Sequence, residues 1–203
     1  MKIKKEKWGT LDRVLAGIWR MLDQGAAHSN DPFHRPVLGT ITGEGCSLRT
    51  VILRQVEVPG RILVCHTDAR SAKVQEIMNC SQISWLFYHP KKKIQVRIAG
   101  NATLHAHDPY AERQWADTSI TSRLNYSTSQ PPGARIDKPS SGLPDFLLNK
   151  IPTLLEAERC RKNFMVIVMH ILSIDWLLLK ITGNRRALFE WDKDRLHATW
   201  LVP

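Results

Sequence analysis

The chain has 203 residues, of which 43% are hydrophobic and 24% are charged. This length fits one domain, and the hydrophobic content allows a sizeable core, which argues against a disordered chain. The 29 basic and 19 acidic residues give a net charge of +10, which favours an anionic partner: nucleic acid, a membrane surface or a phosphorylated small molecule.

We expect neither a signal peptide nor a membrane span. Asp12 and Arg13 interrupt the region after the charged N-terminus, so no apolar signal region forms. The most apolar run, Asn163 to Ile181, is broken by polar residues and rich in β-branched ones, which predicts two strands with a bend. Four cysteines without a Cys-x-x-Cys pair predict reduced, buried thiols. A cytoplasmic protein is therefore expected.

The first part of the chain predicts a helix followed by three strands. Apolar residues recur at helical spacing over Leu11–Gln24, within an N-terminal helical arm of residues 1–30. Strands are predicted at residues 36–42, 47–57 and 61–67, separated by turns rich in Gly and Pro. A short helix is expected at Ser71–Met78.

Two further strands are predicted in the middle of the chain. Ile83–His89 has the composition of a buried strand. The strand after it alternates cleanly between apolar and polar residues. One side carries Ile94, Val96, Ile98 and Ala102, and the other carries Lys93, Gln95, Arg97, Asn101 and Thr103. This alternation predicts a sheet with one packed face and one polar face.

The composition changes after a predicted helix at Pro109–Ser119. Residues 119–150 form a long loop rich in Ser, Pro and Gly, and such loops are either functional or disordered. Strand patterns then return, with a Gly183-Asn184 turn between two of them. Several antiparallel strands with few helices predict one mostly β domain over residues 1–203, a barrel or sandwich with flanking helices.

The segment Thr67–Lys73 has the features of an anion site. A strand ends there and a helix begins, and the first turn of a helix presents unpaired N–H groups with partial positive charge. Arg70, Ser71 and Lys73 supply further donors, and Arg49 would complete the cradle if its strand pairs nearby. The alternative is an ordinary helix start with capping residues and surface cations.

Other motifs give weaker signals. The amide of Gln95 can recognise a heterocycle, although a solvated strand face explains it as well. His105 and His107 lack a third metal ligand, so no metal site is predicted. No phosphate-binding glycine motif or nucleophile elbow is present. Basic tracts at residues 2–7 and 91–93 leave nucleic-acid binding open, without a recognised motif for it.

Four segments occur in one particular order along the chain. They are RTVILR (Arg49–Arg54), HTDARSAK (His66–Lys73), QVRIAG (Gln95–Gly100) and a late strand with Arg185-Arg186. Together they resemble the pyridoxamine 5′-phosphate oxidase-like, FMN-binding split-barrel family, over about residues 36–189. The resemblance implies an antiparallel split β-barrel and a homodimer with FMN at the subunit interface.

The resemblance also implies roles for individual residues. Ser71 and Lys73 would grip the phosphate of FMN, Gln95 would contact its isoalloxazine ring, and Arg186 would contact the flavin. Residues 129–130 would reach FMN from the partner subunit. The full set of implied cofactor-binding residues is Arg49, Thr50, Val51, Leu53, His66, Thr67, Arg70, Ser71, Lys73, Gln95, Ser129, Gln130 and Arg186.

The sequence departs from this family at the positions that contact the substrate in the oxidase. An Arg-x-His segment that holds the pyridoxal group is replaced by Thr182-Gly183-Asn184, and Arg54 stands where the oxidase has a substrate-contacting lysine. The resemblance implies an FMN-dependent oxidoreductase acting on a small molecule, with unknown substrate and catalytic residues and without nucleic-acid or membrane partners. The alternatives are a non-catalytic flavin-binding protein, a basic nucleic-acid-binding barrel, and haem or a deazaflavin in place of FMN.

Overall fold

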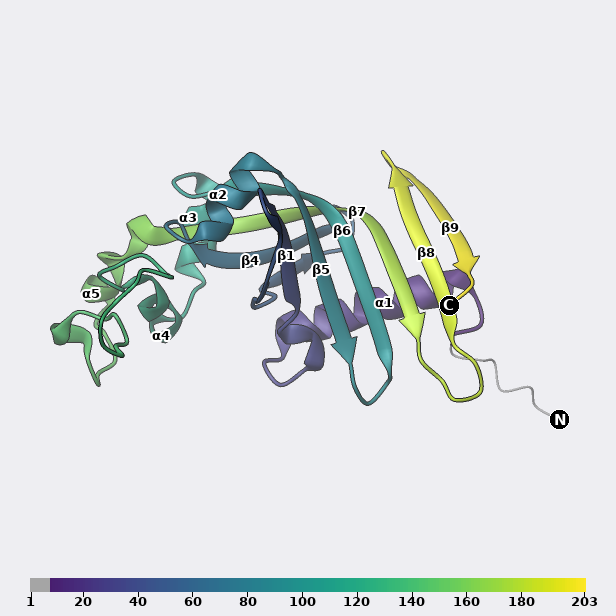
Figure 1. Cartoon of the computed structure of the whole chain (residues 1–203), viewed down its shortest axis with the longest axis horizontal. Coiled ribbons are helices and arrows are strands. Elements are labelled where there is room, and N and C mark those ends of the chain that lie inside the picture. The colour runs from purple at the N-terminus through teal and green to yellow at the C-terminus, as the bar shows by residue number, and fades with distance from the viewer. Residues whose placement is uncertain (1–7) are drawn as a thin grey trace.

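The computed structural model describes residues 8–203 as one nine-stranded sheet with helices packed against it (Figure 1). The strands are β1 (Val37–Thr42), β2 (Gly45–Thr50), β3 (Gln55–Glu57), β4 (Ile62–Asp68), β5 (Gln82–His89), β6 (Ile94–His105), β7 (Phe164–Leu178), β8 (Arg185–Asp192) and β9 (Arg195–Leu201). The helices are α1 (Leu11–Ala27), α2 (Ala72–Asn79), α3 (Pro109–Ala116), α4 (Ile120–Arg123) and α5 (Leu154–Glu158). Short 3-10 turns are η1 (Pro32–His34), η2 (Leu124–Tyr126), η3 (Asp145–Leu147) and η4 (Arg161–Asn163).

The sheet forms an antiparallel split barrel. Its main path runs β2-β1-β5-β6-β7-β4-β3, and β8 and β9 continue from β7. Residues 51–54 join the two end strands: Val51 and Leu53 donate their N–H groups to the segment before β1, and Arg54 donates to Val64 of β4 at 2.8 Å. No ladder joins β2 directly to β3, so the barrel stays split. The predicted mostly β, split-barrel fold is confirmed.

The barrel interior is filled by the inner face of the sheet and by α1. The alternation predicted for β6 is confirmed, because Val96 and Ile98 are fully buried while Arg97 between them is exposed. Ile18 and Leu22 of α1 lie one turn apart and are buried against the same core. The helix predicted over residues 11–24 is confirmed and continues to residue 27.

Strand β7 spans the whole molecule. Its first half pairs with β4 and its second half with β8, while β6 pairs with both halves. The register with β6 shifts at Leu172, which lies between the paired residues Ile171 and Ser173. The prediction of two strands in this segment is wrong, since this β-bulge absorbs the bend and the strand continues.

Two further expectations are corrected. The strand predicted at residues 47–57 is divided into β2 and β3, because residues 51–54 cross from β1 to β4. All four cysteines are free thiols as expected, but only Cys65 and Cys160 are buried. Cys46 is exposed because it lies on the outer side of the β1–β2 hairpin, and Cys80 is half-buried at the end of α2.

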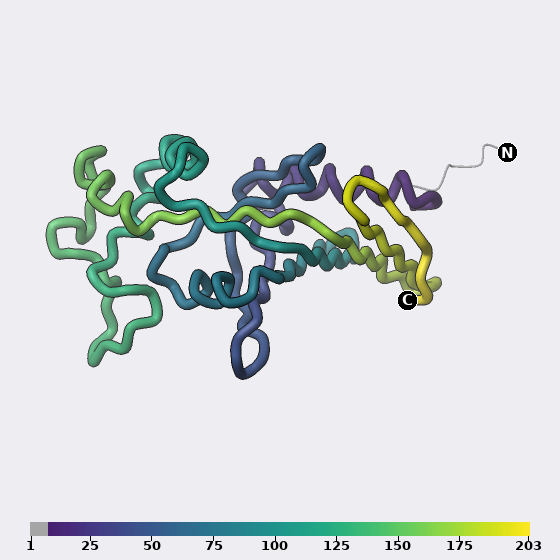
Figure 2. Tube along the Cα trace, turned by 90° about the horizontal axis from the view of Figure 1, so that it is seen from above, coloured from purple at the N-terminus to yellow at the C-terminus, as the bar shows by residue number. Residues whose placement is uncertain are grey.

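Residues 117–163 form an excursion at the end of the molecule opposite the β8–β9 hairpin (Figures 1 and 2). The excursion contains α4, α5 and three 3-10 turns. Arg123 organises it: this buried side chain donates to the carbonyls of Thr118 and Trp115 and to the carboxylate of Glu158. The basic tract predicted at residues 2–7 lies outside the described residues.

Gly100 allows β6 and β7 to approach closely at the bulge. A Cβ atom at this position would lie 2.0 Å from the carbonyl oxygen of His170. Gly100→Ala is therefore expected to lower the free energy of unfolding by about 1–3 kcal/mol, measured by urea denaturation. Gly43→Ala is the control, since a Cβ there meets nothing within 4 Å. Equal stability of the two variants would contradict the close approach.

Candidate functional site

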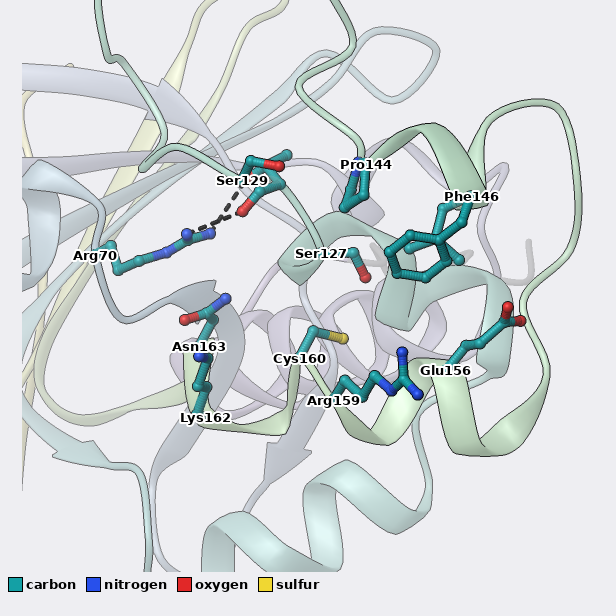
Figure 3. Close-up of a pocket in the computed structure, with 12 residues that line it drawn as sticks. Arg70, Ser127, Ser129, Pro144, Phe146, Glu156, Arg159, Cys160, Lys162 and Asn163 are labelled. Atoms are coloured by element: carbon teal, nitrogen blue, oxygen red, sulfur yellow. Dashed lines mark hydrogen bonds between the residues drawn. The ribbon is translucent and has the colours of Figure 1, made fainter.

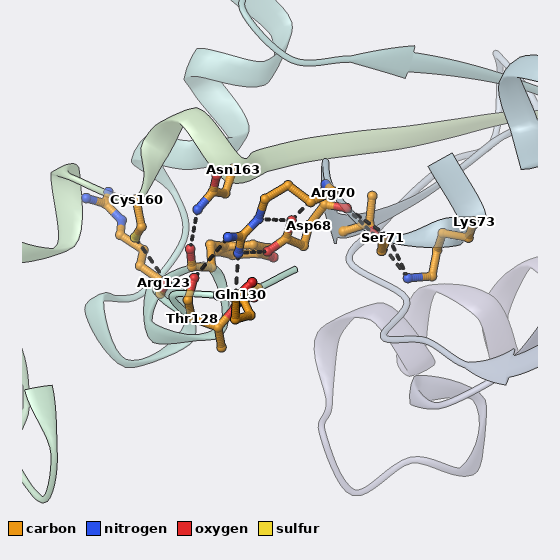
Figure 4. Close-up of polar contacts among 11 residues, drawn as sticks. Asp68, Arg70, Ser71, Lys73, Arg123, Thr128, Gln130, Cys160 and Asn163 are labelled. Atoms are coloured by element: carbon orange, nitrogen blue, oxygen red, sulfur yellow. Dashed lines mark hydrogen bonds and ion pairs between the residues drawn. The ribbon is translucent and has the colours of Figure 1, made fainter. Parts of the chain in front are cut away.

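A cluster of hydroxyl groups and one ammonium group lies where β4 ends and α2 begins. The hydroxyl oxygens of Thr67 and Ser71 are 3.0 Å apart. Lys73 Nζ donates to both, at 3.1 Å to Thr67 and 3.0 Å to Ser71 (Figure 4). Ser71 Oγ donates in turn to the carbonyl of Asp68 at 2.8 Å. The Ser71 side chain therefore leaves the first N–H groups of α2 uncapped.

The ammonium of Lys73 has hydroxyl partners but no carboxylate partner. Within residues 8–203, no carboxylate oxygen lies within 4.0 Å of Lys73 Nζ. Burial lowers the pKa of Lys73, and the positive charge of Arg49 lowers it further, while the negative charges of Asp68 and Glu76 act in the opposite direction. A half-buried cation of this kind can stabilise an anionic ligand.

Arg49 reaches this cluster from β2. It pairs with the buried Leu38 across the ladder, so its side chain takes the inner face of the sheet. Its guanidinium donates to Thr40, to the carbonyl and hydroxyl of Ser47 at 2.9 and 2.6 Å, and to the carboxylate of Glu76 at 2.7 Å. The structure thus brings together four of the predicted residues, which we call the cationic cradle: Arg49, Thr67, Ser71 and Lys73.

The residues that follow Arg49 point in several directions. Thr50 is exposed on the outer face, whereas Val51 and Leu53 are buried in the core. Arg54 lies near His66, because its positive charge contributes to lowering the pKa of that histidine. The Nε atom of Arg54 is buried and has no hydrogen-bond partner among residues 8–203. Of this segment, only the side chain of Arg49 joins the cradle.

His66 faces away from the cradle, since it alternates with Thr67 along β4. Its Nε2 atom is 3.0 Å from Oε1 of Gln114, whose amide donates in turn to Gln55. The imidazole also packs edge-on against Phe164, with ring centroids 4.8 Å apart. Burial lowers the pKa of His66 from 6.5 to about 4, so the ring is neutral at physiological pH.

Arg70 is directed toward the excursion and away from Lys73. It pairs with the carboxylate of Asp68, through Nε at 3.0 Å and Nη2 at 2.7 Å. It also donates to the carbonyl of Thr128 at 2.9 Å and to its hydroxyl at 3.0 Å (Figure 4). The structure therefore does not bring Arg70 into the cradle, and its contacts hold the excursion against the entry to α2.

Ser129 and Gln130 are exposed in the same part of the excursion. Ser129 lines a cavity of about 340 Å³ whose walls also include Arg70, Phe146 and Arg159 (Figure 3). Neither Ser129 nor Gln130 has a hydrogen bond to the cradle of its own chain among the described residues. The geometry leaves both residues available to another molecule.

Gln95 and Arg186 lie on the outer face of the sheet, opposite to the cradle. Both are register partners of Leu177 and therefore share its face. Arg186 donates to the carboxylate of Asp175 at 3.0 and 2.7 Å, and Arg97 pairs with the same carboxylate. Burial acts to raise the pKa of Asp175, but the hydrogen bonds from the two arginines outweigh it and the pKa is lowered.

A shallow apolar groove lies beside this ion-pair cluster. Four small residues from neighbouring strands leave a hollow of about 450 Å³: Gly39, Ser84, Ala99 and Ser173. Leu48 and Leu86 stand at its rim with 68% and 38% of their surface exposed. Exposed apolar surface of this kind is typical of ligand-binding or subunit interfaces.

Two acidic residues of the site, Glu76 and Asp175, are not among those predicted from the sequence. Glu76 follows Lys73 by three residues, so the helical period alone places both on one face of α2 and gives a usable signal. Asp175 gives no such signal, because its contacts with Arg97 and Arg186 depend on the register of three strands.

Within residues 8–203, no group of three His, Cys, Asp or Glu side chains is placed to hold a metal ion. His105 instead pairs with Asp108 at 2.7 Å. In this range no helix combines the length and apolarity needed to cross a bilayer.

A known protein family matches a segment of the chain that runs from α1 to the end of β6. Residues 17–106 match the family model described as pyridoxamine 5′-phosphate oxidase, FMN-binding domain. The resemblance to this FMN-binding family is confirmed. The matched range contains the whole cradle and Gln95, whereas Ser129, Gln130 and Arg186 lie beyond it.

Solved structures share the fold over nearly the whole chain. A pyridoxamine 5′-phosphate oxidase-related, FMN-binding protein from Nostoc punctiforme PCC 73102 has a TM-score of 0.73 and 23% identity, over 93% of this chain and 96% of that one. PhzG from Burkholderia lata 383, in complex with tetrahydrophenazine-1-carboxylic acid, has a TM-score of 0.67 and 16% identity, over 95% and 90% of the two chains. No curated protein matches the chain.

The neutral, half-buried His66 should make stability depend on pH. Its pKa of about 4 in the folded chain lies below its ordinary value of 6.5. As the pH falls, this histidine is therefore protonated in the unfolded chain at a higher pH than in the folded chain. Stability is unaffected above pH 6.5 and falls as the pH drops toward 4. At pH 4.5 the expected loss is about 2–3 kcal/mol relative to pH 7, measured by urea denaturation.

His66→Gln should remove this part of the acid sensitivity, because glutamine does not titrate. His107→Gln, which changes an exposed histidine, is the matched control and should retain it. An unaltered pH dependence in the His66 variant would contradict this prediction, because it would show that protonation of the imidazole does not destabilise the folded chain.

Proposed function

We propose that the chain is an FMN-binding flavoprotein that acts as an FMN-dependent oxidoreductase. The observation that carries this proposal is the cationic cradle, in which Lys73 donates to two buried hydroxyl groups and Arg49 reaches the neighbouring Glu76 of the same helix. The family match over residues 17–106 supports FMN as the ligand, because that domain is described as FMN-binding.

The donors of the cradle fit a phosphate monoester. Among the described residues, Lys73 Nζ has hydroxyl oxygens as its hydrogen-bond acceptors, so an anion placed there would gain a charge–charge interaction with the ammonium. Hydroxyl groups and the uncapped N–H groups of α2 add further donors. This donor set favours FMN over riboflavin, which lacks the phosphate.

The chain supplies binding and orientation for the redox chemistry. Bound FMN would transfer a hydride through its N5 atom. The cradle would anchor the phosphate, and the Gln95 amide, which is both donor and acceptor, would orient the ring. Arg186 would place a positive charge near the ring, and Asp175 holds this guanidinium in position through two hydrogen bonds.

We infer that a homodimer completes the site. The predicted cofactor residues divide between the two faces of the sheet: the cradle lies on the inner face, and Gln95 and Arg186 lie on the outer face. Ser129 and Gln130 are exposed and have no contact with the cradle of their own chain among the described residues. A second copy docked on the apolar outer groove would supply the missing contacts and cover Leu48.

The substrate would be a small molecule. Arg54 stays our candidate for contacting it, because its buried Nε offers an unpaired donor. A flavin-binding protein without turnover is the second candidate, favoured by Thr182-Gly183-Asn184 in place of the family's Arg-x-His segment.

The direct test is equilibrium dialysis of the purified protein against FMN, followed by visible absorbance spectroscopy. Binding of one FMN per chain with a perturbed flavin spectrum would support the proposal. Reduction of that flavin by an amine or nicotinamide donor, with reoxidation by oxygen, would separate the oxidoreductase from the flavin-binding protein. Absence of FMN binding would reject both, and haem, a deazaflavin and nucleic acid would then be tried.

Lys73→Ala should weaken FMN binding by about tenfold or more, since a charge-assisted hydrogen bond contributes about 1.5–3 kcal/mol. Flavin fluorescence titration measures the affinity, and the affinity for riboflavin should stay unchanged. Lys91→Ala removes an exposed cation from the β5–β6 turn and is the matched control. Equal FMN affinity in both variants would remove Lys73 from the phosphate site.

Leu48→Asp should convert the dimer to monomers, because it places a charge at the rim of the apolar groove. Light scattering after size exclusion measures the mass, and FMN affinity should fall with dimerisation. Leu155→Asp changes a leucine of α5 that is 72% exposed and should leave the mass unaltered. A wild-type monomer that still binds FMN would contradict the shared site.

A further inference from the structure

Glu76 is an acidic side chain inside a cluster that is otherwise built for an anion. It lies on α2 one helical turn after Lys73. Its Oε2 atom accepts from Arg49 Nη2 at 2.7 Å and from Thr40 Oγ1 at 2.5 Å. The side chains of Arg49 and Glu76 are only 20% and 17% exposed. The carboxylate therefore uses donors that a bound phosphate would also need.

This carboxylate changes the charge that a phosphate ligand meets. Arg49 and Lys73 are two cations and Glu76 is one anion, so the three side chains together carry a net charge of +1. A phosphate monoester carries a charge of about −1.5 to −2 near neutral pH. Repulsion between two anions a few ångströms apart in a half-buried site amounts to more than about a tenfold factor in affinity.

A second role for Glu76 would be to orient Arg49 for the ligand. The contacts of Arg49 argue against this role, because Ser47 alone accepts two hydrogen bonds from the guanidinium, at 2.9 and 2.6 Å. Thr40 accepts a third. Arg49 would therefore keep its direction without the carboxylate, and the main effect of Glu76 is its charge.

We propose that Glu76 is an affinity- and specificity-determining residue of the cradle, an internal anion that competes with the ligand phosphate for Arg49 and Thr40. This inference rests on the proposed FMN site and deepens it. The phosphate must displace the carboxylate, so the chain holds FMN more weakly than the same cradle would with a neutral side chain at position 76. The preference for FMN over riboflavin is reduced by the same factor.

The test is Glu76→Gln, which keeps the size of the side chain and removes its charge. FMN affinity, measured by flavin fluorescence titration, is expected to rise about tenfold or more, while riboflavin affinity stays within twofold. Glu76→Ala must change FMN affinity in the same direction, which excludes an effect particular to the amide. Asp23→Asn removes an exposed charge from α1 and is the matched control. Urea denaturation verifies that each variant is folded.

The outcomes separate this inference from the proposed function. Wild-type protein that binds FMN, with equal or weaker binding in both Glu76 variants, would overturn the competition and leave the FMN site standing. Equal gains for FMN and riboflavin would also overturn it, since the phosphate would then not be involved. A failure of wild type and variants alike to bind FMN would overturn the proposed function and this inference with it.

Discussion

The pairing of β7 with β6 along nearly its whole length is the constraint on which the rest of the structure depends. Because β7 holds β4 on its first half and β8 on its second, one strand belongs both to the barrel and to the outer extension. The bulge at Leu172 lets the strand bend without ending, and Gly100 makes the necessary close approach possible. The pairing of β4 with the first half of β7, which ends at Asp68 opposite Phe164, fixes where β4 ends and with it the position of Thr67 and α2.

This arrangement brings residues of β2, β4 and α2 together in the cationic cradle, where positive charge is concentrated. Within residues 8–203, Lys73 is half-buried, donates to two hydroxyl groups and has no carboxylate oxygen within 4.0 Å of its ammonium, while the charges of Asp68 and Glu76 act on it from farther away. Arg70, in contrast, is neutralised by Asp68 and ties down the excursion. Lys73 and Arg70 thus have different roles: Lys73 would be available to a ligand, and Arg70 is structural. Both are basic residues near the start of α2, so the sequence alone does not distinguish them.

The two faces of the sheet divide the chemistry between them. The inner face carries the cationic cradle, and the outer face carries an ion-pair cluster around Asp175 beside an apolar groove. Such a division explains why one chain does not bring all the predicted cofactor residues together. It also separates two properties of the protein: the charge balance around Glu76 would set the affinity for the phosphate, and subunit association would complete the surroundings of the ring.

The sequence by itself determined the features that depend on neighbours along the chain. These are the period of α1, the alternation of β6 and the Ser71-x-Lys73 start of α2, together with the family resemblance that the order of four motifs carries. Only the tertiary structure decided which side chains meet across strands, because register and bulges depend on pairings between distant segments. The contact of Arg49 with Glu76, 27 residues apart, is of this second kind. The helical period could place Glu76 beside Lys73, but only the packing of α2 on β1 and β2 shows that its carboxylate lies in the cradle.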